Sequence, residues 1–194
     1  LDISIDLALK NFKKLIKKAS ESSNFLRIDM ESSKNTDSTF YMYKDLFKTY
    51  PKVGVVLQAY LKRSIADIEM LAGPGFNARI CKGIYKENKN IAYQNPEDIS
   101  KNFLEMARIM LAKNSYACYA THDLQLIDDL ISLTKNMDAD PSKFEFQVLY
   151  GVPMKGKLKK LLKSGYKVRV YVPYGPDWYE YSLRRLKENP NIAG

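Results

Sequence analysis

The sequence predicts an α/β protein in which short parallel strands alternate with helices, in the manner of a β/α barrel. Strand-like and helix-like segments alternate along all 194 residues. A strand, a helix and a second strand in this order form a right-handed crossover between parallel strands. The strand-like segments are short and almost continuously apolar, as strands are when both faces of their sheet are covered.

Each element can be placed from its pattern, and together they predict a single domain over residues 1–194. Runs rich in valine, isoleucine, leucine and aromatic residues predict six strands, near 25–30, 53–61, 78–85, 116–120, 144–150 and 168–173. Apolar residues three and four positions apart predict helices over 7–18, 39–49, 65–71, 96–113, 124–135, 155–163 and about 176–189. The run Gly73-Pro74-Gly75 ends the third of these helices.

A doubly wound open sheet fits the same alternation, but the positions of polar residues favour the barrel. Polar residues recur at the C-terminal ends of many strands: Asp29, Gln58, Arg79 with Lys82, Thr121 with His122, Gln147, and Tyr171. In a barrel these ends converge on one mouth, whereas in an open sheet they spread along an edge. A closed β/α barrel has eight strands. We therefore predict a partial barrel with six of them, and expect two N-terminal strands outside this sequence.

Composition excludes several classes of protein. The longest apolar runs fall short of the ~18 residues that a membrane helix needs. His122 is the only histidine, so a multi-histidine metal site is impossible, and we predict no metal site. Cys81 and Cys118 lie in apolar runs and are expected to be buried free thiols in a reducing compartment. The net charge of +9 fits either an acidic partner such as nucleic acid or anionic lipid, or simply a solvated surface.

The last predicted strand and helix form a segment suited to binding an anion. In the final helix Tyr181, Arg184, Arg185 and Glu188 fall at positions i, i+3, i+4 and i+7 and therefore share one face. Two adjacent guanidinium groups match the geometry of a carboxylate or a phosphate. An amphipathic surface helix with an ordinary charged face explains the same spacing. Any nucleotide would have to bind without a glycine-rich dinucleotide or phosphate loop, since neither pattern occurs.

Seven motifs in one order resemble the proline dehydrogenase family, above all its stand-alone bacterial members. They are RIDME (27–31), VVLQAYL (55–61), RICKGIY (79–85), YATHD (119–123), FEFQVLYG (144–151), VRVYVPYG (168–175) and YSLRRLKEN (181–189). The resemblance covers essentially the whole sequence. The opening LDIS resembles the stretch just after the family's second strand, which normally carries an active-site lysine; that lysine is absent from this sequence.

The resemblance implies an enzyme that oxidises L-proline to 1-pyrroline-5-carboxylate with FAD and passes the electrons to a membrane quinone. It implies catalytic roles for Asp29 and Arg79, with Arg79 near the flavin N5. It implies a substrate site in which Arg184 and Arg185 bind the proline carboxylate and Tyr171 and Tyr181 line the pocket. The cofactor contacts that it implies are Met30, Leu57, Gln58, Arg79, Lys82, Gly83, Ile84, Thr121, His122, Gln147 and Glu188.

Several of these residues have simpler explanations. Asp29 and Asp123 are at positions typical of helix N-caps, and His122 could serve only the start of the following helix. An alternative interpretation is another β/α-barrel enzyme that acts on a phosphorylated or carboxylate metabolite. A nucleic-acid-binding module would need exposed aromatics among its lysines, and here most aromatics fall in strand runs. We therefore expect no nucleic acid partner. We also expect a cytoplasmic protein with peripheral contact to anionic membrane.

Overall fold

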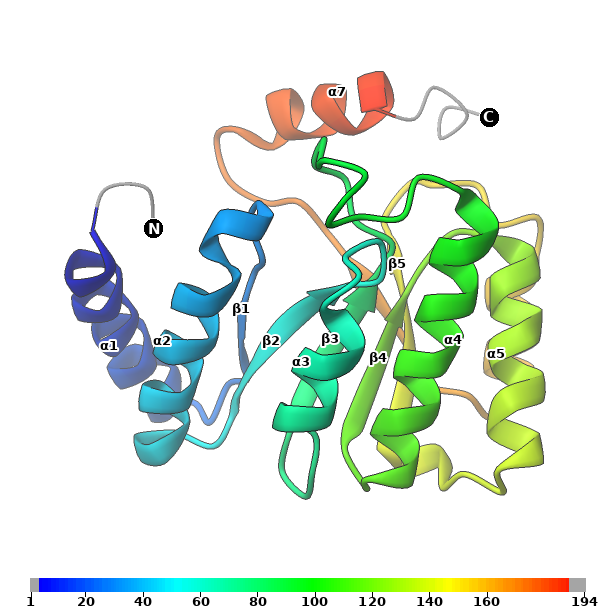
Figure 1. Ribbon diagram of the computed structural model, residues 1–194, viewed down its shortest axis with the longest axis horizontal. Coiled ribbons are helices and arrows are strands. Elements are labelled where there is room, and N and C mark those ends of the chain that lie inside the picture. Colours follow the sequence, from blue (N-terminus) through cyan, green and yellow to red (C-terminus); the bar gives the residue numbers. More distant parts are fainter. Residues whose placement is uncertain (1–3, 189–194) are drawn as a thin grey trace. The chain divides into compact units, whose positions relative to one another are not determined.

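A computed structural model of the chain describes the backbone of residues 4–188 and the side chains of residues 4–183 (Figure 1). The chain divides into two units, residues 1–117 and 118–194. Each unit is described below by itself.

The strands form one six-stranded sheet in the order β1-β2-β3-β4-β5-β6. They are β1 (Leu26–Ile28), β2 (Val53–Gln58), β3 (Asn77–Cys81), β4 (Tyr116–Ala120), β5 (Phe144–Leu149) and β6 (Val168–Tyr171). The helices are α1 (Ile5–Glu21), α2 (Thr36–Thr49), α3 (Ser64–Leu71), α4 (Pro96–Ala112), α5 (Leu124–Asn136), α6 (Lys157–Lys163) and α7 (Trp178–Glu188). Short 3-10 turns, η1 (Ser33–Asn35) and η2 (Pro141–Lys143), precede α2 and β5. Sequential strand order without a switch point is the order of a β/α barrel, so the predicted fold class is confirmed.

In the first unit, the parallel strands β1, β2 and β3 are covered by helices. Residue 28 of β1 pairs with residue 55 of β2, which pairs in turn with residue 78 of β3. Helices α2 and α3 pack on β2, and α4 packs on β3. All six residues of β2 are buried, which explains its continuous apolar sequence. Leu46, Ile68 and Met106 supply fully buried side chains from the three helices.

The N-terminal ends of these strands are tied together by an arginine. The Arg27 guanidinium donates to the carbonyl oxygens of Val55 (2.9 Å) and Asn77 (3.0 Å) and to the Asn77 side chain (2.6 Å). It lies over Gly54, where a Cβ atom would come within 2.6 Å of it. Glycine at position 54 is therefore required by close approach rather than by backbone conformation.

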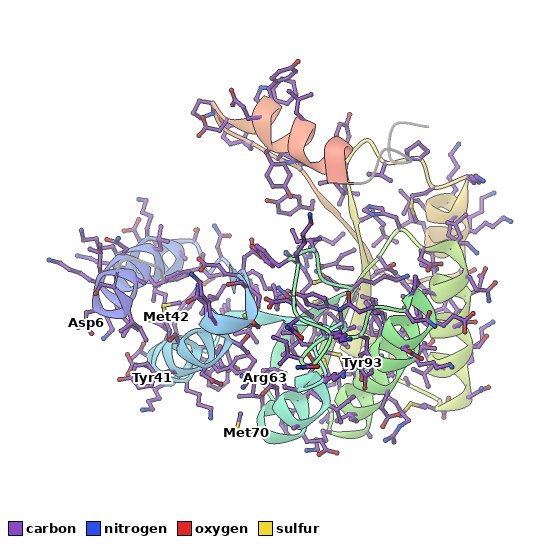
Figure 2. The ribbon with its side chains drawn as sticks, turned by 45° about the horizontal axis from the view of Figure 1, so that its top comes forward. Asp6, Tyr41, Met42, Arg63, Met70 and Tyr93 are labelled. Atoms are coloured by element: carbon purple, nitrogen blue, oxygen red, sulfur yellow. The ribbon has the colours of Figure 1, made fainter. Side chains whose placement is uncertain are left out.

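Helices α2 and α3 are joined by Arg63 (Figure 2). Its guanidinium binds Asp67 through two bonds of 2.8 and 3.0 Å, and it also donates to Asp37 in the first turn of α2. Adjacent residues of α2 show its amphipathic character, because Met42 is 2% exposed and Tyr41 is 61% exposed. These contacts hold α2 and α3 together where both helices pack on β2.

In the second unit, β5 and β6 pair in parallel, with residue 148 opposite residue 170. The rings of Tyr119, Phe144 and Phe146 are fully buried and contact one another. The strand β6 differs from the others, because Arg169, Val170 and Tyr171 are exposed. Within the described residues, no helix is long and apolar enough to cross a membrane.

The element boundaries depart from the prediction mainly at strand ends. Strand β2 ends at Gln58 rather than at residue 61, and β3 ends at Cys81 rather than at residue 85. The apolar residues that follow β2 are buried for another reason: Tyr60 and Leu61 pack with Ala92. The helix predicted from residue 155 begins at Lys157, because Lys155 and Gly156 have positive φ angles. Cys118 is buried as expected, but Cys81 is only partly buried.

Candidate active site

Asp29, the residue after β1, forms an ion pair with Arg79 of β3. Arg79 Nη1 donates to Asp29 Oδ1 at 2.9 Å, and the Arg79 side chain is 21% exposed while that of Asp29 is 67% exposed. The two residues are 50 positions apart in the chain. The register of three parallel strands brings them together near the C-terminal edge of the sheet, although Arg79 lies in the middle of β3 rather than at its end, where the sequence placed it. A pair with one exposed partner contributes little to stability. Its effect is instead to hold the Arg79 guanidinium in one position beside Asp29.

Gln58, the last residue of β2, lies at the same edge and is 4% exposed. Its Nε2 donates to the carbonyl oxygen of Glu31 at 3.1 Å. Its Oε1 is buried, and no donor among the described residues bonds to it. An unsatisfied buried amide oxygen costs about 1–3 kcal/mol. The first unit therefore holds a buried acceptor near this edge that has no donor among the described residues.

Two apolar residues at the same strand ends are buried. Leu57 is 2% exposed and Met30, just after β1, is 8% exposed. The segment after β3 is more open: Lys82 is partly buried and Ile84 is 55% exposed. These four residues were all predicted to contact a cofactor, and the structure brings them to one edge of the first unit's sheet.

Gly83 occupies a place that only glycine can fill. Its φ is +104°, and a Cβ atom there would lie 2.2 Å from the ring of Tyr60. The prediction gave Gly83 the role of admitting a cofactor close to the backbone. The structure supplies a different reason for the glycine, since the space beside its Cα is filled by an aromatic ring of the protein itself.

At the end of β4, His122 is oriented by the backbone of β5. Its Nε2 accepts the N–H of Leu149 at 2.9 Å. Burial lowers the pKa of this half-buried imidazole below 6.5. The neutral ring must therefore carry its proton on Nδ1, which makes that nitrogen a donor. The helix α5 is capped by Asp123, which accepts from Gln125 N–H and Leu126 N–H at 3.1 Å each. Asp123 is thus the N-cap of α5, whereas the His122 side chain bonds to β5, and its cofactor role stays a prediction.

Thr121 and Gln147 also have defined partners in the second unit. Thr121 Oγ1 accepts the N–H of Asp123 at 3.1 Å, which closes the turn into α5. Gln147 Nε2 donates to Glu145 Oε1 at 2.6 Å. Glu145 is itself buried, and its carboxylate accepts two hydrogen bonds of 2.6 and 3.0 Å from the Arg169 guanidinium. Sequence reasoning missed Glu145 and Arg169. An acidic residue two positions before Gln147 in an otherwise apolar strand was the signal, because alternate strand residues share one face.

The two tyrosines predicted to line the substrate pocket do meet. The ring centroids of Tyr171, on β6, and Tyr181, on α7, lie 6.0 Å apart with the planes inclined by 40°. The predicted carboxylate-binding pair, Arg184 and Arg185, falls on α7, as does Glu188. The side chains of these three residues lie outside the described part of the structure, so their roles stay predictions.

Comparisons with known proteins identify the family. The proline dehydrogenase family profile matches residues 1–194. Proline dehydrogenase 2 of Bacillus subtilis strain 168 is 41% identical over 194 residues, which is all of this chain and 64% of that protein. The chain belongs to the proline dehydrogenase family. The proline dehydrogenase of Deinococcus radiodurans is 38% identical over 190 residues, 97% of this chain and 61% of that protein. The chain thus spans less than two thirds of these relatives.

Solved structures show the same fold. Proline utilization A (PutA) of Bdellovibrio bacteriovorus, inactivated by N-propargylglycine, matches 97% of this chain and 22% of its own, with a TM-score of 0.86 and 23% identity. A PutA mutant of Bradyrhizobium japonicum matches 97% of this chain and 22% of its own, with a TM-score of 0.82 and 21% identity. At these identities the likeness establishes the fold alone.

Proposed function

We propose that this chain forms the catalytic barrel of an FAD-dependent enzyme that oxidises L-proline to 1-pyrroline-5-carboxylate. The observation that carries the proposal is the set of groups at the ends of β1, β2 and β3. The Asp29–Arg79 pair and the buried Gln58 lie on three neighbouring strands of one unit. Family membership and the names of the relatives support the same activity.

The residues present fit a flavin. The unpaired Oε1 of Gln58 needs a donor, and the pyrimidine edge of an isoalloxazine ring has an imide N–H. Leu57 and Met30 offer the apolar contact that a flat ring requires. In the first unit the segment from Lys82 to Ile84 would hold polar parts of the cofactor, and in the second unit we assign the Nδ1–H of His122 as a donor to it. When bound, FAD would supply the redox chemistry for the two-electron oxidation of L-proline.

Arg79 and Asp29 set the electrostatics at the reacting end. A guanidinium is always charged, so Arg79 stabilises negative charge that develops near it in the transition state. The bond to Asp29 Oδ1 holds the guanidinium in one orientation before any ligand arrives. Preorganised charge of this kind needs no rearrangement when the reaction occurs, which is why it accelerates the reaction.

Substrate recognition is assigned to the last strand and helix. Arg184 and Arg185 on α7 would bind the proline carboxylate through bidentate, charge-assisted bonds. The contacting rings of Tyr171 and Tyr181 would pack against the pyrrolidine ring. Glu188, one turn after the arginine pair, would meet the cofactor or orient the arginines.

We also propose that the electrons pass to a membrane quinone while the enzyme contacts anionic lipid peripherally. The surface around α6 supports this: Leu162 is 59% exposed and lies among exposed lysines at 155, 159, 160 and 163. Lys157 is not part of this surface, because its ammonium binds Asp128 at 2.6 and 2.7 Å. Lysines around an exposed apolar side chain are typical of surfaces that attach to anionic lipid.

The absorption spectrum of the purified protein, before and after addition of L-proline without oxygen, tests the proposal. We expect flavin bands that bleach on addition of proline and return with a quinone analogue. A protein without flavin that binds inorganic phosphate would instead favour a barrel enzyme acting on a phosphorylated metabolite. Sedimentation with anionic vesicles, against zwitterionic vesicles, tests the membrane contact separately.

A further inference from the structure

The segment between β3 and α4, residues 82–95, is closed at its base by backbone hydrogen bonds. After β2 the backbone continues alongside both ends of this segment. Tyr60 N–H donates to the Lys82 carbonyl at 2.9 Å, and Tyr93 N–H donates to the Tyr60 carbonyl at 2.8 Å. An isolated antiparallel bridge joins Leu61 and Ala92. The two ends of the segment therefore lie next to each other beside Tyr60 and Leu61. The Tyr60 ring packs against Gly83.

The far end of the same segment is attached to a different loop by Glu87. Its Oε1 accepts the backbone N–H of Ser33 at 2.7 Å, and its Oε2 accepts the Ser33 hydroxyl at 2.9 Å. Ser33 is the first residue of η1, which runs directly into α2. The backbone N–H of Ser33 has no acceptor within the helix, because it lies at the helix start, and the Glu87 carboxylate supplies one. The carboxylate also interacts favourably with the positive end of the α2 dipole.

The attachment has a geometric consequence. Glu87 belongs to the segment after β3 and Ser33 to the loop after β1, and β2 lies between these strands in the sheet. The segment therefore passes across the end of β2, where Gln58 lies. Together with the Asp29–Arg79 pair and the bond from Gln58 to the Glu31 carbonyl, the Glu87–Ser33 contact ties three consecutive strand ends to one another.

We infer that Glu87 is a positioning residue: its two bonds to Ser33 hold residues 82–84 and 29–31 in the arrangement that binds the flavin. The inference rests on the function proposed above. Glu87 acts through the two stretches of backbone that its bonds connect. Ile84 is three residues before Glu87, and Asp29 is four residues before Ser33. A glutamine at position 87 has the same shape but no charge, and an amide NH2 replaces one of the two carboxylate oxygens, so the charge-assisted bonds to the Ser33 N–H and hydroxyl are weakened.

The test uses Glu87→Gln, with Lys89→Gln as the matched control that removes one charge from the same segment. Two quantities are measured: the flavin dissociation constant, and amide hydrogen exchange in the apoprotein over residues 31–35 and 82–92. We expect Glu87→Gln to raise the dissociation constant about tenfold, equivalent to ~1.4 kcal/mol, and to speed exchange in both regions. Exchange in the core strands should not change, and Lys89→Gln should leave both quantities at parent values.

A double-mutant cycle locates the effect on the contact itself. Ser33→Ala removes the hydroxyl donor but leaves the backbone N–H, so it should weaken flavin binding less than Glu87→Ala does. In a Glu87→Ala protein, Ser33→Ala should have no further effect. Additive effects would overturn the inference, as would Glu87→Gln affinity and exchange within twofold of the parent. Faster exchange everywhere would show a merely structural role. If the parent protein bound no flavin, the proposed function would be overturned. If Glu87→Gln left amide exchange unchanged in both regions, only the inference about Glu87 would be overturned.

Discussion

The ends of β1, β2 and β3 and the segment formed by β6 and α7 carry similar polar and aromatic residues but are built differently. At the first region, side chains from different strands bind one another: Asp29 pairs with Arg79, and Gln58 bonds to the Glu31 carbonyl. At the second, β6 is largely exposed, and the described contact with α7 is between the rings of Tyr171 and Tyr181.

This difference separates two tasks of an enzyme site. Groups that stabilise charge in a transition state must be fixed in advance, and the first region has the cross-strand bonds that do so. Groups that recognise a substrate can be ordered by the substrate itself. We therefore expect substitutions in the first region to change turnover or cofactor binding, and substitutions on α7 to change substrate affinity.

Replacing Arg79 should have the largest effect. Arg79→Met keeps much of the side chain's length but removes the charge that Asp29 orients. We expect turnover with proline to fall by about 100-fold, in line with the loss of one transition-state donor, while flavin content changes little. Arg108→Met is the matched control, since Arg108 forms a similar ion pair with Glu105 on α4. Equal losses of flavin and activity would contradict the role given to Arg79.

On α7, Arg185→Lys should weaken proline binding. Lysine keeps the charge but cannot make the planar bidentate contact, and losing such a contact in a desolvated site costs about 2–5 kcal/mol. We expect proline and proline analogues to bind roughly 30-fold more weakly or worse, with an unchanged flavin spectrum. The measurement is a titration of the flavin spectrum with an analogue. If Arg184→Lys and Arg185→Lys both stayed within about twofold of the parent, α7 would be an ordinary charged surface helix.

The sequence was sufficient to predict the strand order and most of the residues at the strand ends. Both follow from local patterns: apolar runs mark the strands, and polar residues after them mark the edge. The pairing of Asp29 with Arg79 was not predictable in detail, because it depends on the register of three strands. The path of residues 82–95 was not predictable at all, since Glu87 meets Ser33 across 54 positions of chain.

Strand lengths were overestimated for a physical reason that also concerns the site. Residues such as Tyr60 and Leu61 are apolar and buried, but they pack against a loop rather than continue β2. Periodicity and composition cannot distinguish these two environments. The glycine at 83 was singled out, yet the Tyr60 ring that occupies its side-chain space could be found only from the structure.

The contact between Gly83 and Tyr60 can be tested through stability. Gly83→Ala introduces a Cβ atom 2.2 Å from the Tyr60 ring at a φ of +104°, whereas at Gly151, with a φ of +84°, nothing lies within 4 Å. Both variants strain the backbone, but only Gly83→Ala is also overpacked. We expect its free energy of unfolding to be lower than that of Gly151→Ala by about 1–2 kcal/mol. Denaturant unfolding measures the difference, and equal values would mean that the ring moves aside freely.

The smallest expected effect concerns His122 and pH. Burial holds the pKa of the folded imidazole below the unfolded value of about 6.5. Between these two pKa values the unfolded chain binds a proton that the folded chain does not, so stability falls as the pH drops through about 6.5. Protonation of Nε2 would also end its bond to the Leu149 N–H. His122→Gln keeps an acceptor for that N–H but does not titrate. Its free energy of unfolding should therefore fall less than the parent's between about pH 7.5 and 5, and parallel curves for the two proteins would show that the imidazole has the same pKa in the folded and unfolded states.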